Sequence, residues 1–187
     1  MPAVVDRGKL LDAALRVFGE HGYRGATTRR IADEAGVNEV TIFRQFGSKD
    51  ALIHEAIRSR VIGGTDARLP ATPADPAREL TAWGQAVARN LWEQRAVLRQ
   101  AIAEQFQHPA WAPTGIDHGR DALTDYLRRL APPVSDDELR AAVGMLSGAL
   151  FFEAMMRDLE PDAFLKSLDD AVADYVRVFC RALGLVP

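Results

Sequence analysis

The stretch AGVNEVTIFRQFGSKDAL, which begins at residue 35, carries side chains whose types and spacing could read a nucleic acid. On a helix turning about 100° per residue, Ile42 and Phe46 point to one side. The other side presents four residues: Val40, Thr41, Phe43 and Arg44. Arginine can bond guanine O6 and N7, threonine a base or a phosphate, and valine a thymine methyl group. Such a face suits the major groove of DNA, although short helices with polar exposed faces are commonly just solvated.

An acid, Glu39, stands at the first position of this helix. A carboxylate there is favoured by the positive end of the helix dipole by about 0.3–1 kcal/mol, which is a purely structural role. The alternative is functional, because an acid at the entrance of a groove can accept from cytosine N4 or can repel phosphates of unsuitable sequences. Both interpretations stay open at this point.

Two short helices with a glycine between them are needed to position this face. The first is expected to open at Thr27 or Thr28 and to end at Ala35, where Gly36 allows a left-handed turn. Asn38 is a good cap for the second helix, which Gly47 ends. A helix from Asp6 to about His21 precedes the pair, and a helix from Lys49 to about Val61 follows it. These proportions are typical of a helix-turn-helix.

Helical periodicity dominates the rest of the chain too, which predicts an all-α fold. Residues 63–76, GGTDARLPATPADP, have the composition of a linker and separate two expected domains, 1–62 and 63–187. Further helices are expected over the ranges 77–92, 95–106, 116–130, 136–158 and 161–183, with a capping box at Ser135 and Glu138.

The segment from Leu11 to Ile53 resembles the DNA-binding domain of the TetR family of bacterial transcriptional repressors. The resemblance lies in the first helix with Phe18, the turn GYRGATT, the stretch IADEAGV, the helix TIFRQF and the sequence SKDAL, in that order. It covers roughly a third of the chain. It implies a three-to-four-helix DNA-binding domain, followed by a larger helical domain for ligand binding and dimerisation.

The resemblance also implies which side chains meet DNA. Phosphate contacts are expected from Thr28, Lys49 and the aromatic Phe43; base or groove contacts are expected from Asn38, Val40, Thr41, Arg44 and Gln45. Arg29 and Glu39 complete the expected set. Three residues depart from the family pattern: Glu39 is commonly basic, Val40 commonly glycine and Phe43 commonly tyrosine. Phe43 has no hydroxyl to donate to a phosphate, so a contact there must be apolar.

Family members are homodimers, because two reading helices must lie about one turn of DNA apart, roughly 34 Å. The two C-terminal helices are expected to form the interface, since their apolar residues cover more than one face. Gly144 and Gly148, one turn apart, would permit close approach. The alternative is that both helices are core helices of a monomer. An unidentified small-molecule effector is implied by the resemblance, and its candidate lining residues are Trp83, Trp92, Phe106, Trp111, Phe152, Met155 and Met156.

Composition and motifs argue against other functions. The chain has a net charge of −3, with ten Lys or Arg against eight Asp or Glu in residues 1–60 and 13 against 18 thereafter. Cys180 is the sole cysteine, and the early charged residues leave no signal peptide, so a cytoplasmic protein is expected. The longest apolar stretch, 145–152, is too short to span a membrane.

Catalytic motifs are absent, so no enzyme and no cofactor is expected. The best metal cluster is formed by His108, Asp117, His118 and Asp121, but its spacing fits no known ligand set and no metal is expected. The sequence therefore predicts a ligand-released repressor that binds a pseudo-palindromic operator. An all-helical interaction module and an activator are the alternatives.

Overall fold

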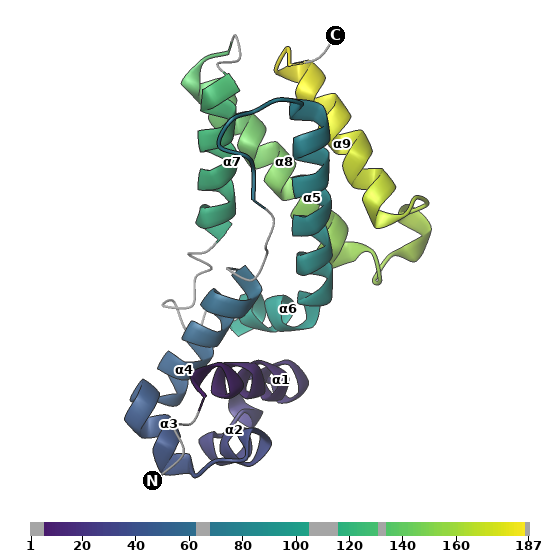
Figure 1. The fold of residues 1–187 in the computed structure, drawn as a ribbon. Helices are drawn as coiled ribbons and strands as arrows, with labels where there is room; N and C mark the ends of the chain where they lie inside the picture. The colour runs from purple at the N-terminus through teal and green to yellow at the C-terminus, as the bar shows by residue number, and fades with distance from the viewer. Residues whose placement is uncertain (1–5, 63–67, 105–115, 131–133, 186–187) are drawn as a thin grey trace. The chain divides into compact units, whose positions relative to one another are not determined.

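The computed structural model describes residues 6–62, 68–104, 116–130 and 134–185, and these residues form helices and turns without strands (Figure 1). The all-α prediction is confirmed. The chain divides into two compact units. Unit 1 comprises Met1–Gly64 with Ala96–Gly115, and unit 2 comprises Thr65–Arg95 with Ile116–Pro187.

Unit 1 is built from short helices whose starts are capped by side chains. Its helices are α1 (Arg7–Gly25), α2 (Thr28–Ala35), α3 (Glu39–Phe46), α4 (Lys49–Ala56) with a π-helical continuation (Ile57–Ile62), and α6 (Arg95–Glu104). Asp6, Thr27, Asn38 and Ser48 each accept a hydrogen bond from a backbone N–H in the first turn of the helix that follows. Each cap satisfies a donor that the helix itself leaves unpaired.

Gly22 breaks the regular geometry of α1, as the sequence predicts, with φ at 63°. The three following residues continue as a short helical turn that leads into α2. A Cβ at Gly22 would lie 2.9 Å from the side chain of Gln100 on α6. Glycine is therefore needed here for its left-handed backbone and for the close approach of α6.

Helix α6 packs with unit 1 although it follows α5 in the sequence. Its buried side chains are Val97, Leu98 and Ala101, and Val97 lies against Gly19 of α1. The sequence assigns the whole of 63–187 to a second domain. The linker composition marks one boundary, but it does not show that a later helix packs with the first unit. The division of the structure instead places Ala96–Gly115 with the first sixty-four residues.

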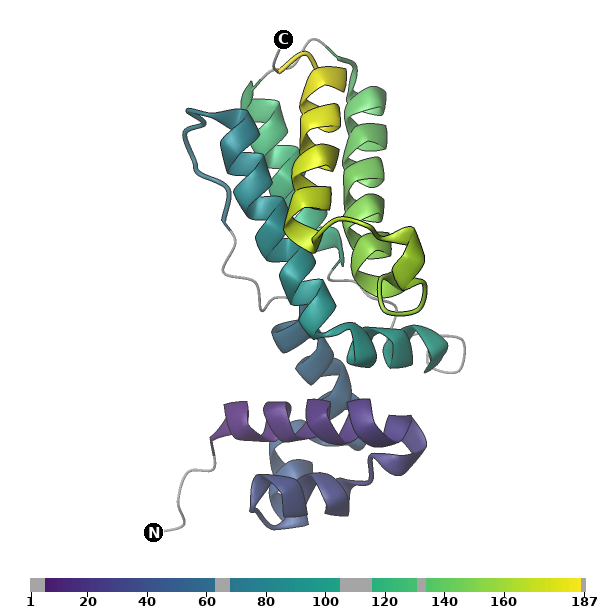
Figure 2. The ribbon, with the colours of Figure 1, turned by 90° about the vertical axis from the view of Figure 1, so that its right-hand side faces the viewer.

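Unit 2 contains the longer helices, α5 (Pro76–Glu93), α7 (Ile116–Leu130), α8 (Asp136–Met156) and α9 (Leu168–Ala182). Helices α5 and α9 lie side by side in both ribbon views, and α8 packs against α5, α7 and α9 (Figure 2). The fully buried side chains at its centre include Leu80, Leu123, Tyr126, Leu127 and Val172. Gly84 allows the contact of α5 with α9, since a Cβ there would lie 3.0 Å from Val172 Cγ1.

The last helix begins later than the sequence predicts. Pro161 opens only a 3₁₀ turn, which ends at Ala163, and Phe164 has non-helical φ and ψ angles of −116° and 76°. Helix α9 begins at Leu168, where the hydroxyl of Ser167 accepts from the N–H of Asp170 at 3.1 Å. A proline favours a helix start, but the serine supplies the cap that Pro161 lacks.

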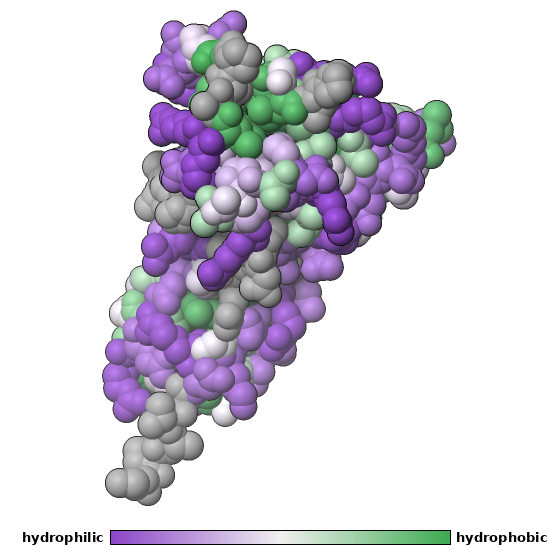
Figure 3. Space-filling model, turned by 45° about the horizontal axis from the view of Figure 1, so that its top comes forward, coloured by the Kyte–Doolittle hydropathy of each residue, from purple (hydrophilic) through white to green (hydrophobic). Residues whose placement is uncertain are grey.

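Helix α8 is long and apolar enough to cross a membrane by length and composition alone. A core helix of a soluble protein meets the same criteria, and one side of α8 is indeed in the core, with Leu139, Val143, Leu146 and Leu150 buried. Only 39% of its most apolar stretch is buried, however. Figure 3 tilts toward the viewer the end of unit 2 where α5 begins and α9 ends, and shows apolar side chains gathered there.

The capping box that begins α8 is expected to contribute measurably to the stability of unit 2. Ser135 Oγ accepts from the Glu138 N–H at 3.3 Å, and Glu138 Oε2 accepts from the Ser135 N–H at 2.8 Å. Ser135→Ala should lower the free energy of unfolding by about 1 kcal/mol, because a helix N–H loses its partner. Thermal unfolding measures this loss. Arg140→Lys, at an exposed position of the same helix, keeps both bonds and the charge and is the control. An equal loss in both variants would contradict the capping role.

Candidate nucleic-acid interface

One side of helix α3 is apolar and buried in unit 1, and the other side is exposed to solvent. Ile42 and Phe46 are buried, whereas Val40 is 69% exposed and Phe43 50% exposed. Arg44 is also exposed. The structure thus places the two sides of this helix as the sequence predicts. A helix of eight residues gains little stability from its own hydrogen bonds, so the buried pair must fix it on the unit.

The turn before α3 fixes its direction relative to α2. Thr27 caps α2 through its hydroxyl, at 3.2 Å from the Arg30 nitrogen. Gly36 then adopts a left-handed conformation with φ of 67°, and its N–H bonds back into the last turn of α2. A Cβ at Gly36 would meet nothing within 4 Å, so the backbone angle alone requires glycine. Asn38 Oδ1 accepts from the Val40 N–H at 2.9 Å and starts α3.

Glu39 and Thr28 form a hydrogen bond that the sequence gives no reason to expect. The Thr28 hydroxyl donates to Glu39 Oε1, and both residues are half-buried. The bond joins the first residue of α2 to the first residue of α3. A threonine hydroxyl has one proton, so Thr28 cannot give it to Glu39 and to a phosphate at once. Glu39 therefore has two structural roles: its charge is favoured by the helix dipole, and its carboxylate bonds Thr28.

Lys49 is also committed to a contact within the protein. Its Nζ lies 2.8 Å from the carbonyl oxygen of Tyr23 and 3.6 Å from the centre of the Tyr23 ring. Burial lowers the pKa of Lys49, and the carboxylates of Asp50 and Glu104 oppose that shift. Burial and a hydrogen bond to Asp50 raise the pKa of Tyr23 to about 12. The ammonium group therefore fastens the start of α4 to the end of α1.

The ten predicted DNA-binding residues lie on α2, α3 and the start of α4, with different exposure. Exposed residues are Arg29, Asn38, Val40, Phe43 and Arg44; half-buried residues are Thr28, Glu39, Thr41, Gln45 and Lys49. The most exposed members belong to α3. This distribution of exposure suits an interface in which α3 contacts DNA and the half-buried residues hold α3 in position.

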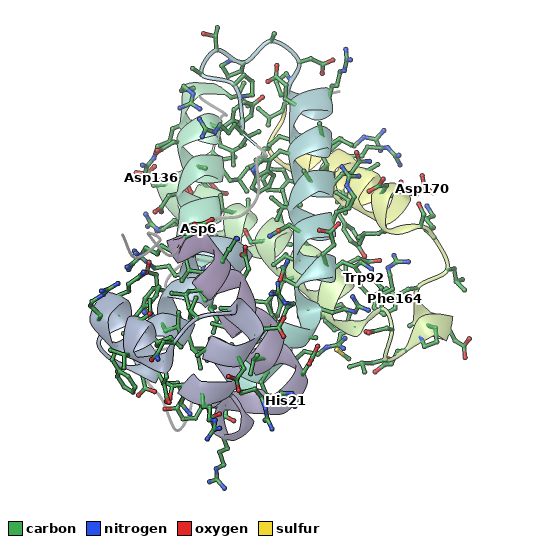
Figure 4. The ribbon with its side chains drawn as sticks, turned by 60° about the horizontal axis from the view of Figure 1, so that its bottom comes forward. Asp6, His21, Trp92, Asp136, Phe164 and Asp170 are labelled. Atoms are coloured by element: carbon green, nitrogen blue, oxygen red, sulfur yellow. The ribbon has the colours of Figure 1, made fainter. Side chains whose placement is uncertain are left out.

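Sequence reasoning missed Arg7, whose guanidinium bonds Glu55 on α4 and the backbone of α3. These partners lie 48 and 38 residues away, and a single sequence contains no signal that pairs them. The labelled Asp6 in Figure 4 marks the start of the same helix.

The candidate effector-binding residues occupy different environments. Trp83 and Met155 are buried in the core, whereas Phe152 is 56% exposed. Trp92 and Met156 are half-buried, and Phe106 and Trp111 lie outside the described residues. An aromatic pocket lined by all seven has no support from the described part of the chain and stays a prediction.

Trp92 has a local partner that accounts for its position. The guanidinium of Arg95 stacks 3.8 Å from its ring centre and forms an ion pair with Asp158, with 2.9 Å between Nε and Oδ2. These contacts join the end of α5 to the segment between α8 and α9. Figure 4 places Trp92 and Phe164 at this same end of unit 2. The Phe164 ring pairs with that of Phe152 at 6.0 Å.

A groove of about 500 Å³ lies between α5 and α9 in unit 2. Its lining includes Arg78, Thr81 and Gln85 from α5, and Val176, Arg177 and Cys180 from α9. None of the five candidate effector residues that the structure describes lines it. Burial raises the pKa of the Cys180 thiol.

A metal site receives no support from the described residues, in which no three His, Cys, Asp or Glu side chains gather to hold an ion. Of the predicted cluster, Asp121 is exposed on α7. His108 lies outside the described residues, as do the side chains of Asp117 and His118.

Comparison with known proteins identifies the family. Residues 10–56 match the family model described as bacterial regulatory proteins, tetR family. The uncharacterised regulator YvkB of Bacillus subtilis is 30% identical over 129 residues, which are 65% of this chain and 66% of that protein. The repressor AcnR of Corynebacterium efficiens is 45% identical over 49 residues, 26% of each chain.

A solved structure extends the likeness of fold to nearly the whole chain. A transcriptional regulator from Rhodococcus sp. Rha1 superposes with a TM-score of 0.75 and covers 97% of this chain and 100% of its own, at 21% identity. The sequence matches cover just under two thirds of YvkB and about a quarter of AcnR. The family consists of transcriptional regulators and not of enzymes. Residues 10–56 form a helix-turn-helix DNA-binding domain of the TetR family of bacterial regulatory proteins.

Proposed function

We propose that this regulator is a homodimeric repressor that binds a pseudo-palindromic DNA operator through α3 and leaves it when an effector binds. The observation that carries the proposal is the exposed face of α3. Val40 and Phe43 are large apolar side chains held in solvent beside Arg44, while Ile42 and Phe46 anchor the helix. Solvation does not favour such a combination, but a groove that offers thymine methyl groups and guanine acceptors does.

Dimer formation is supported by the uncovered side of α8. Met145 is 76% exposed and Phe152 56% exposed, and Gly148 lies exposed between them. This spacing of three and four residues forms one stripe along the helix. Val178 of α9 is 68% exposed as well. A second copy of the chain would cover this stripe, and two copies would present two α3 helices to DNA.

Release by an effector follows from linkage. A small molecule that binds unit 2 more tightly in a conformer with unsuitable spacing of the two α3 helices must lower the affinity for DNA. By linkage, DNA lowers the affinity for the small molecule by the same factor. The name of AcnR, a repressor, supports repression over activation. An apolar or aromatic effector is favoured by the many aromatic and Met side chains of unit 2. The cytoplasm is the compartment that this function requires.

Selection of bound duplexes from a random or genomic library tests the proposal. The expected result is a pseudo-palindrome whose half-sites are about one helical turn apart. Binding to it should weaken steeply with salt, by about 10³-fold or more between 50 and 200 mM if six or more phosphates are contacted. Failure to enrich any sequence would favour a helical interaction module. Genes that fall silent when the protein is removed would instead indicate an activator.

Replacing Glu39 by glutamine separates its two proposed roles. The amide oxygen can still accept from Thr28, whereas the negative charge is lost. If the charge repels phosphates, binding to scrambled DNA should tighten by about two- to five-fold, and the preferred bases should shift at the position beside the start of α3. A binding profile and an affinity identical to those of the unmodified protein would leave only the structural role. Asp33→Asn, on the exposed side of α2, is the matched control for loss of a charge.

A further inference from the structure

One guanidinium group joins three helices of unit 1. Arg7, at the start of α1, bonds Glu55 of α4 through two parallel contacts, Nε to Oε1 at 3.0 Å and Nη2 to Oε2 at 2.6 Å. Its Nη1 donates to the carbonyl oxygen of Gln45 at 3.1 Å. Its Cζ lies 4.2 Å from the centre of the Phe46 ring. Arg7 therefore contacts the last two residues of α3 and Glu55, near the C-terminal end of α4.

The C-terminal end of α3 is the place where such a contact has most effect. Gln45 belongs to the last turn, whose carbonyl groups have no partner within the helix. A cation is favoured there by the negative end of the helix dipole. Helix α3 has eight residues and two buried side chains, Ile42 and Phe46. The bond between Thr28 and Glu39 holds the start of α3, and the Arg7 contacts hold its C-terminal end.

Another ion pair of unit 1 offers a comparison. Arg16 of α1 contacts Glu34 of α2, with 2.8 Å between Nε and Oε1. The two arginine side chains are similarly exposed, 50% for Arg7 and 55% for Arg16. Each pair is half-exposed, and such pairs contribute little to overall stability. The difference is that Arg7 touches the helix that is proposed to read DNA.

We propose that Arg7 is a positioning residue for sequence discrimination, which holds the end of α3 on α4 and so fixes the direction in which Val40, Thr41 and Arg44 point. The inference rests on the proposed function, because it concerns how the same surface reads DNA. A side chain that forms two bonds to a base edge must be placed within a fraction of an ångström, so a small tilt of α3 loses base contacts. Phosphate contacts tolerate a small tilt better, since they carry no sequence information.

The test compares Arg7→Ala, Arg7→Lys and Arg16→Ala in the full chain. Two duplexes are used, the sequence selected from the library and a scrambled duplex of equal length and composition, at one salt concentration. For Arg7→Ala, the ratio of the two affinities should fall by at least about ten-fold, while binding to the scrambled duplex changes by less than about three-fold. Arg16→Ala should leave the ratio within about three-fold of the unmodified protein. Arg7→Lys should lie between, because lysine keeps the charge but not the two parallel bonds.

Two results would overturn the proposal. An equal loss on both duplexes, with a salt slope reduced by about one, would mean that Arg7 itself contacts a phosphate. Equal behaviour of Arg7→Ala and Arg16→Ala would mean that the contact is merely structural.

A measurement without DNA keeps this inference separate from the proposed function. Hydrogen exchange of the amides at the end of α3, such as Gly47, whose N–H bonds to the Phe43 carbonyl at 2.9 Å, should quicken several-fold in Arg7→Ala and not in Arg16→Ala. Unchanged exchange there would contradict the positioning role whatever the DNA results. An unmodified protein that prefers no sequence would instead overturn the proposed function, and with it the part of this inference that concerns DNA.

Discussion

Arg44→Ala is expected to weaken binding to the selected operator by about 1–3 kcal/mol for each half-site, because a bidentate contact to guanine is worth that much. A dimer contains the change twice, so the total loss should approach twice that value. Arg44 lies exposed on α3 beside Val40 and Phe43, and the last turn of that helix is held by the burial of Phe46. The measurement is a comparison of affinities for the operator and for a scrambled duplex at fixed salt.

The scrambled duplex decides what Arg44 contacts. If Arg44 contacts a base, Arg44→Ala should bind the scrambled duplex almost as tightly as the unmodified protein does, and its preference at one base position of the operator should relax. Arg29→Ala is the comparison, since Arg29 is exposed in the first turn of α2, where phosphates are favoured by the helix dipole. We expect Arg29→Ala to weaken binding to both duplexes equally and to lower the salt slope. The same pattern in Arg44→Ala would contradict base reading.

Met145→Asp is expected to convert the proposed dimer into a monomer at micromolar concentration. Met145 is 76% exposed in the single chain and is the most exposed apolar side chain in the stripe of α8. In a symmetric dimer the substitution would bury two unpaired carboxylates in one interface, at a cost of several kcal/mol. The dissociation constant of the dimer should therefore rise by at least about 100-fold, which corresponds to about 2.7 kcal/mol. Sedimentation or light scattering over a range of concentrations measures the change.

A control variant separates loss of the dimer from loss of the fold. Ala122 is exposed on α7 in the same unit, so Ala122→Asp adds an equal charge at a helical surface position. It should leave both the oligomeric state and the thermal unfolding unchanged. Met145→Asp should keep its helical circular dichroism and should bind operator more weakly, because two α3 helices no longer act together. A dimer that persists in Met145→Asp would show that α8 is not the interface, and a monomeric unmodified protein would contradict the dimer altogether.

The boundaries of α2 and α3 could be predicted from the sequence because their signals are local. Asn38 caps α3 within two residues and Gly36 adopts the left-handed conformation expected at a helix end. The capping box at Ser135 and Glu138 is likewise confirmed. The division of α3 into a buried and an exposed side follows from the helical repeat alone, and Ile42 and Val40 lie as predicted. The family was also readable from the sequence, since its motifs gather in residues 10–56.

Contacts between distant residues were decided by the tertiary structure. The sequence favours a phosphate contact for Lys49, but the packing of α1 on α4 brings the Tyr23 carbonyl within 2.8 Å of its ammonium group. The Thr28 hydroxyl turns to Glu39 because the Gly36 turn brings the starts of two helices together. Spacing along the chain contains no information about either approach, since each depends on how helices with similar apolar stripes pack.

Caps and helical periodicity act within a few residues, so the type of the elements, most of their ends and the exposed face of α3 could be predicted from the sequence. Three features depend instead on how the helices pack: α6 lies with unit 1, Arg7 contacts the end of α3, and the stripe of α8 through Met145 and Phe152 is left uncovered. Burial and ion pairing depend on which surfaces meet, and partners 38 or 48 residues apart meet only after the helices have packed.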